Sequence, residues 1–128
     1  MTKLIGIIFL LFSFFSNSYS DDIYKAFAVA IYDENKMGEN IQHKTTTQND
    51  YNGICYVKIA IFGKISNNSK IEVNIGNSIG NFQEKIPITN NKNIVIGYEY
   101  SFKFYTVTKG HIEVKVDNKL YDSKVFVK

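Results

Sequence analysis

Aromatic side chains occupy every second position in the stretch GYEYSFKFYTVTKG, residues 97–110: Tyr98, Tyr100, Phe102 and Phe104. Side chains alternate between the two faces of a β-strand, so a strand here carries all four aromatics on one face. Ile94 and Ile96 continue that face toward the N-terminus, unless Gly97 introduces a bulge that switches their side. An apolar face this continuous must be covered, which predicts a second layer packed against it.

Further runs alternate with the same period of two and are rich in Ile, Val, Tyr and Phe, which favours strands over helices. Together with the aromatic run, the predicted strands cover residues 24–32, 54–62, 70–75, 82–89, 93–107, 111–116 and 124–127. The segments between them are rich in Asn, Gly, Ser and Asp, which are turn residues. We therefore predict an all-β fold, an antiparallel immunoglobulin-like β-sandwich of about seven strands. The polar interval 33–50 is its predicted long loop.

Residues 1–20 have the features of a signal peptide. After one lysine, an apolar stretch covers residues 4–15, and the small residues Ser18 and Ser20 suit a signal peptidase. This stretch is shorter than the roughly 17 to 25 residues that span a bilayer as a helix, and no second one follows. We predict a single domain at residues 21–128 that is secreted, periplasmic or extracellular and has no membrane span. An uncleaved N-terminal anchor is the alternative.

Two absences in the composition narrow the choice of partners and of stabilising bonds. All 15 basic residues are lysine, and the absence of Arg, the preferred reader of bases and phosphates, argues against nucleic acid as a partner. Cys55 is the only cysteine, so stability must come from packing rather than from an intramolecular disulfide. Cys55 shares an alternating face with Val57, Ile59 and Ile61, which predicts a buried thiol rather than a metal ligand or an intermolecular disulfide.

The sequence contains no recognisable catalytic or metal-binding pattern. His43 and His111 are the only histidines, and neither belongs to an HExxH motif or to a copper-site spacing. The carboxylate pairs at 21–22 and 33–34 are adjacent in sequence, so a strand points their members to opposite faces. There is no GxSxG and no Gly-rich phosphate loop. We therefore predict a protein that is not an enzyme and that has no cofactor and no metal site.

The C-terminal half, KIPITNNKNIVIGYEYSFKFYTVTKGHIEVKVDNKLYDSKVFVK, has a recognisable order of features. The pair Pro87-Ile88 closes one strand, and Tyr98 and Tyr100 lie on the next. Gly110 precedes the strand that contains Val114 and Val116, and a final strand lies around Phe126. Upstream, YVKIAIFGKISNNSKIEVNIG looks like two paired central strands. In these features the chain resembles the ML lipid-recognition family, which includes sterol-transfer and phospholipid-transfer proteins. Ile86 stands where that family usually has a cysteine.

The resemblance implies a secreted immunoglobulin-like sandwich that holds a lipid or sterol between its sheets. Tyrosine hydroxyls on an inward face need polar partners, which indicates a core with an open or wet end. The candidate ligand-binding residues are Tyr98, Tyr100, Ile96 and Val114. The alternative is a protein-interaction or adhesion module with a closed core and an unidentified partner, which pairs through a strand edge or loops. Asn67 begins an N-glycosylation acceptor, Asn-Asn-Ser.

Overall fold

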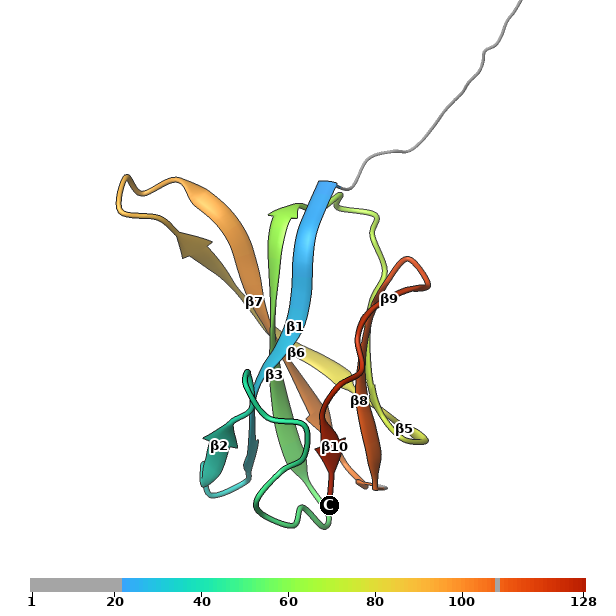
Figure 1. Cartoon of the computed structure of the whole chain (residues 1–128). Helices are drawn as coiled ribbons and strands as arrows, with labels where there is room; N and C mark the ends of the chain where they lie inside the picture. Colours follow the sequence, from blue (N-terminus) through green and yellow to red (C-terminus); the bar gives the residue numbers. More distant parts are fainter. Residues whose placement is uncertain (1–21, 108) are drawn as a thin grey trace, which may run out of the picture.

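The computed structural model describes residues 22–107 and 109–128, which form strands and no helix (Figure 1). The predicted signal peptide, residues 1–20, lies outside the described residues. The strands are β1 (Asp22–Asp33), β2 (Gly38–Asn40), β3 (Cys55–Lys64), β4 (Ile71–Ile75), β5 (Ser78–Ile79), β6 (Asn81–Thr89), β7 (Val95–Phe104), β8 (Gly110–Val116), β9 (Lys119–Asp122) and β10 (Phe126–Val127). No helix in these residues is long and apolar enough to cross a membrane.

The strands form two sheets that pack face to face (Figure 1). One sheet has the order β2-β1-β3-β7-β6, and the other has the order β10-β8-β4-β5, with β9 also paired to β8. Neighbouring strands run antiparallel, so the predicted all-β antiparallel class is confirmed. The core lies between the sheets, and its largest fully buried side chains come from both sheets and from the residue that follows β2: Phe104, Ile31, Ile59, Ile61, Ile75, Ile112 and Ile41.

The central strands β3 and β7 determine the composition of this core. Their register places each inward side chain of β3 opposite an aromatic side chain of β7: Cys55 with Phe104, Val57 with Phe102, Ile59 with Tyr100, and Ile61 with Tyr98. Side chains paired in this way share one face and pack against each other. Tyr100, Phe102 and Phe104 are 4 %, 3 % and 0 % exposed, and Tyr98 is partly buried, which confirms that the aromatic row faces inward.

The inward face does not extend beyond Gly97. Ile94 and Ile96 are 56 % and 37 % exposed, so they do not continue the aromatic row into the core. The register between β6 and β7 shifts by one residue at Ile96, next to the glycine that indicated a bulge. A Cβ atom on Gly97 would lie 2.3 Å from the carbonyl oxygen of Ile61, so only glycine allows β3 and β7 to approach here.

On the N-terminal side of Gly97, β7 separates from β3, and the hairpin of β6 and β7 leaves the sheet. β3 pairs with β7 only as far as Phe62 and Gly97, so residues 88–96 continue as a ribbon that projects from the sandwich (Figure 1). We call residues 88–96 the arm. Its exposed aliphatic side chains include Ile94, Val95 and Ile96.

Each predicted strand has a counterpart in the structure, but β2, β5 and β9 were not predicted. They contain only three, two and four residues, which is too short to show a period. Each exists because a longer neighbour pairs with it: β1 with β2, β4 with β5, and β8 with β9. β2 lies inside the interval 33–50, which the sequence predicted as a loop.

The loop after β2 is organised around one carboxylate. Glu39 accepts hydrogen bonds from two backbone N–H groups, one ammonium and one phenol: Gln48 N at 2.8 Å, Asn49 N at 3.0 Å, Lys44 Nζ at 2.9 Å and Tyr51 Oη at 2.9 Å. The Glu39 side chain is 8 % exposed. Burial alone would raise the pKa of Glu39, but these four hydrogen bonds outweigh burial and lower the pKa from 4.5 to about 2.

Glu39→Gln is expected to lower the free energy of unfolding at pH 7 by about 3 kcal/mol, which is the size of the pKa shift converted to energy. Because the folded pKa lies below the unfolded one, ionised Glu39 stabilises the fold above about pH 4.5, and this contribution is lost as the pH falls toward 2. Urea unfolding at a series of pH values measures both effects. Glu113→Gln is the control, since Glu113 is 40 % exposed and should change stability little.

Cys55 is fully buried, as its alternating pattern predicted, and burial raises the pKa of its thiol to about 12. Since the thiolate is the reactive form, we expect native Cys55 to resist a water-soluble disulfide reagent and to react at once in urea. A Cys55→Ala, Ile79→Cys double variant is the control, because Ile79 is 73 % exposed and its replacement should be labelled immediately. Fast native labelling of Cys55, or a disulfide-linked dimer, contradicts this prediction.

Candidate functional site

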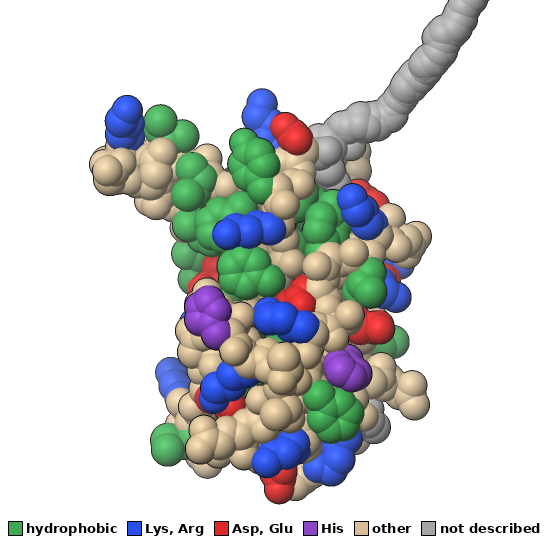
Figure 2. All heavy atoms as spheres, viewed as in Figure 1, with side chains coloured by type: hydrophobic (Ala, Val, Ile, Leu, Met, Phe, Trp, Pro, Cys, Tyr) green, Lys and Arg blue, Asp and Glu red, His purple; other side chains and the backbone are tan. Residues whose placement is uncertain are grey.

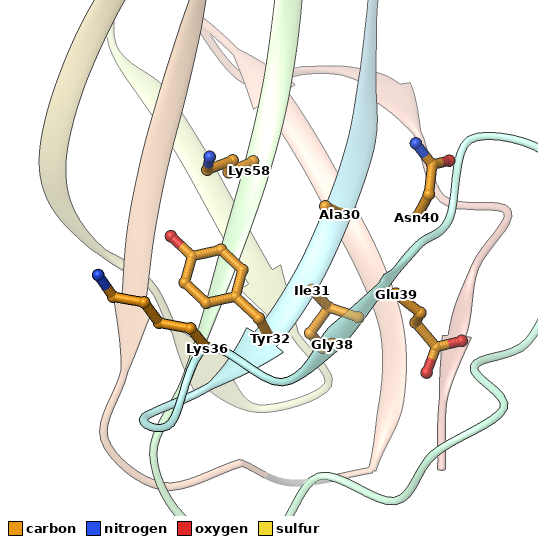
Figure 3. A pocket seen from close by; sticks show the side chains of 8 residues that line it. All are labelled: Ala30, Ile31, Tyr32, Lys36, Gly38, Glu39, Asn40 and Lys58. Carbon is orange, nitrogen blue, oxygen red and sulfur yellow. The ribbon is translucent and has the colours of Figure 1, made fainter.

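One hollow of the described surface lies outside the sandwich. It has a volume of about 470 Å³ and is lined by the β1–β2 hairpin and Lys58 of β3 (Figure 3). Tyr32, Lys36 and Lys58 lie on one side, and Glu39 points away from them (Figure 3). The ring centroids of Tyr32 and Tyr56 are 5.2 Å apart, and the ammonium of Lys58 is 5.7 Å from the Tyr32 centroid. These groups already interact with one another, and the Glu39 carboxylate is occupied by its four donors.

A second hollow lies between the two sheets. It has a volume of about 340 Å³ and opens where the edge strand β6 faces the crossover from β3 to β4. We call it the inter-sheet groove. Its walls combine aromatic and aliphatic side chains with a few polar ones: Phe82, Tyr100, Phe102, Ile65, Ile71, Lys85, Ser66, Asn67 and Ser69. A concave, mostly apolar site of this size with a few polar groups matches the usual small-molecule pocket of about 300 to 1,000 Å³.

Three aromatic rings form the wall of the groove on the side of the first sheet. Phe82 is 55 % exposed, and its ring centroid lies 6.0 Å from Phe102 and 6.3 Å from Tyr100. The ring of Phe82 stands edge-on to Phe102, at an angle of 71°. The buried rings Tyr100 and Phe102 therefore continue the core outward, and Phe82 covers them only in part.

A bulge in β6 decides which charge faces the groove. Phe82 pairs with Phe102 and Lys85 pairs with Tyr100, with one extra residue, Gln83, between the two pairings. Without that extra residue, Glu84 rather than Lys85 would share the face of Tyr100. The bulge thus places an ammonium rather than a carboxylate beside the aromatic wall.

Lys85 is held over the tyrosines of the aromatic row. Its Nζ lies 4.3 Å from the ring centroid of Tyr98 and 5.9 Å from that of Tyr100. Among the described residues, no carboxylate forms an ion pair with Lys85. Its positive charge is therefore available to an anionic group at the mouth of the groove.

The structure brings two of the four predicted ligand-binding residues together. Tyr100 lines the groove, and the ring centroid of Tyr98 lies 6.4 Å from that of Tyr100. Ile96 lies on the arm, where it lines a different, smaller hollow with Tyr24. Val114 is 0 % exposed in the middle of β8 and does not line the groove.

Sequence reasoning did not identify Phe82, Lys85, Ile65 or Ile71 as groove residues. Phe82 begins a predicted strand, but the bulge at Gln83 decides which residues of that strand point inward. Neither Gln83 nor the residues next to it in the sequence are glycine or proline, which would have indicated a bulge. The two isoleucines flank the crossover between sheets and become neighbours of β7 only in the folded protein.

Comparisons of this chain with known proteins match no family model, no curated protein and no solved structure. The described residues contain no group of three or more His, Cys, Asp or Glu side chains arranged to hold a metal ion.

Phe102 and Phe104 provide a matched test of the groove wall. Phe104→Ala should lower the free energy of unfolding by about 3 to 5 kcal/mol, because Phe104 is enclosed on all sides. Phe102→Ala should cost about 1 to 2 kcal/mol less, because one side of its ring already faces a hollow. Urea unfolding measures both losses as a shift of the midpoint, provided that the slope of the unfolding free energy against urea concentration does not change. Equal losses would mean that the groove is closed in solution.

Proposed function

We propose that this chain is an exported, non-catalytic binding protein that holds an amphipathic apolar ligand, a lipid or sterol, in the inter-sheet groove. The observation that carries the proposal is the aromatic wall of Phe82, Tyr100 and Phe102 at the open edge between the sheets, with Lys85 beside it. The signal-peptide pattern of residues 1–20 supports export.

We further propose that the fold is an immunoglobulin-like sandwich. The order β1-β3-β7-β6 in one sheet and β4-β8-β10 in the other supports this, because it is the strand order of an immunoglobulin constant-type domain. Membership of the ML lipid-recognition family is part of the same proposal and rests on the resemblance of residues 85–128. Membership of that family would imply a ligand between the sheets.

Apolar burial supplies the affinity in this proposal. Each CH₂ group that leaves water for the groove contributes about 0.8 kcal/mol. The exposed part of the Phe82 ring gains further burial when a ligand covers it. The groove therefore favours a hydrocarbon chain or ring over a polar solute.

The polar groups of the groove determine how the ligand is oriented. Lys85 provides a positive charge, and Ser66, Asn67 and Ser69 line the side formed by the crossover. An anionic head group gains from Lys85 while its hydrocarbon part lies against Tyr100 and Phe102. We therefore propose a preference for amphiphiles with a carboxylate or phosphate head.

Thermal unfolding with dodecanoate below its micellar concentration and dodecanol below its solubility limit tests the function. Each should raise the unfolding temperature as its concentration rises. At a ligand concentration of 100 times Kd, the free energy of unfolding should increase by about 2.7 kcal/mol. Phe82→Asp should abolish both shifts, and Lys85→Gln should remove the preference for the carboxylate. Ile79→Asp is the control, because Ile79 is also an exposed apolar side chain but lies on β5, outside the groove.

Organic extraction of the purified protein followed by mass spectrometry gives an independent readout. The proposal expects an apolar molecule in the wild-type extract and less of it in the Phe82→Asp extract. If the extract is empty and a panel of lipids and sterols gives no thermal shift, the groove is not a ligand site. The alternative, an interaction module with a closed core, then takes its place.

A further inference from the structure

We propose that the outer face of the first sheet docks this protein onto the surface of an anionic lipid bilayer. We define this docking face by the outward side chains of β1, β3 and β6 at the base of the arm, including the first residue of the arm: Lys25, Phe27, Phe62, Ile86 and Ile88. The inference rests on residues that point away from the inter-sheet groove, so it does not depend on the proposed ligand.

Strand register assembles the docking face from segments far apart in the sequence. Paired residues of neighbouring strands share one face, and two adjacent rows cross four strands on the side opposite the core. The first row contains Lys25, Phe62, Gly97 and Ile88, and the second contains Phe27, Ala60, Glu99 and Ile86. Because Gly97 and Ala60 are small, the large apolar side chains stand on both sides of a shallow centre.

The docking face combines four apolar side chains with Lys25, and its residues are exposed or partly exposed in the monomer. Ile86 is 43 % exposed, and the rings of Phe27 and Phe62 stack with centroids 6.1 Å apart. The ammonium of Lys25 lies 5.5 Å and 5.4 Å from these two rings. Figure 2 shows hydrophobic side chains gathered on the arm and the adjoining upper part of the molecule, with lysines among them. This is the pattern of an interfacial surface, with apolar groups entering the headgroup region and lysines meeting phosphates.

The border of the face strengthens this assignment. Tyr24 is 80 % exposed and lines a shallow hollow with Lys64, Val95 and Ile96. Tyrosine is enriched at membrane–water interfaces, because its ring is apolar and its hydroxyl is polar. Lys92 lies in the turn of the arm, and it carries the only charge among residues 88–96.

The charges of the face favour an anionic bilayer over a second copy of the chain. Lys25 lies on the face and Lys64 and Lys92 lie at its border, whereas Asp22, Glu84 and Glu99 are its acids, and Glu99 lies 3.9 Å from the ammonium of Lys58. A two-fold contact between copies would place this lysine-rich border against itself. Anionic lipid headgroups instead complement it.

Flotation with vesicles of phosphatidylcholine, with and without phosphatidylglycerol, tests the docking face. The wild type should bind the phosphatidylglycerol vesicles, and Ile86→Asp should weaken that binding by roughly tenfold or more because a carboxylate must enter the interface. Ile79→Asp is the matched control and should bind like the wild type, since Ile79 is exposed on the other sheet. Lys92→Gln should weaken binding roughly fivefold at low salt.

A single tryptophan reports insertion directly, because the chain contains none. The emission of Ile86→Trp should shift to the blue with phosphatidylglycerol vesicles and be quenched by brominated lipid, whereas that of Ile79→Trp should do neither. Failure of the wild type to float, or equal responses of the two tryptophans, overturns the proposal.

Two further outcomes also overturn it and name the replacement. A concentration-dependent dimer that Ile86→Asp abolishes would assign the face to a second copy. Vesicle binding that is lost in Phe82→Asp but kept in Ile86→Asp would mean that the groove, rather than the docking face, meets the lipid. If soluble amphiphiles give no thermal shift while flotation still depends on Ile86, the ligand proposal fails and the docking face stands.

Discussion

The rest of the structure depends on the contact between the aliphatic row of β3 and the aromatic row of β7. These two rows lie side by side in one sheet, and together they cover the inward residues of β4 and β8, such as Val73 and Val114. At the Phe104 end the contact is fully enclosed. Tyr100 and Phe102, in the middle of the aromatic row, also line the inter-sheet groove, so the same row that builds the core also borders a groove.

The groove is a consequence of how the sandwich is closed at one edge. β6 is the last strand of its sheet, and its side chains are mostly exposed, so on that side its residues facing the aromatic row are Phe82, Lys85 and Pro87. Edge strands are usually protected by charge, proline or a bulge, and β6 has all three. The bulge at Gln83 and the ring of Pro87 interrupt the regular hydrogen-bonding pattern, which disfavours extension of the sheet by another strand.

One hairpin serves both proposals from its two faces. Lys85 points to the groove, whereas its sequence neighbour Ile86 points to the docking face, because alternate residues of a strand face opposite sides. Gly97 marks the place where β7 leaves β3 and the arm begins. Ligand entry and membrane contact would therefore occur on the same two strands, a short distance from each other.

The sequence by itself determined the strand character of the chain and the inward direction of Cys55, Tyr100, Phe102 and Phe104. A period of two is a local property, and it survives any arrangement of the sheets. Tertiary structure alone decided the short strands, the buried Glu39 and the composition of the groove. The short strands and the groove depend on register, and a single bulge reverses which side chain faces which side. No local pattern places Phe82 beside Phe102, because these residues meet only when β6 and β7 pair. The four donors of Glu39 follow it in the same loop, but they have no periodic pattern and converge on the carboxylate only when the loop folds.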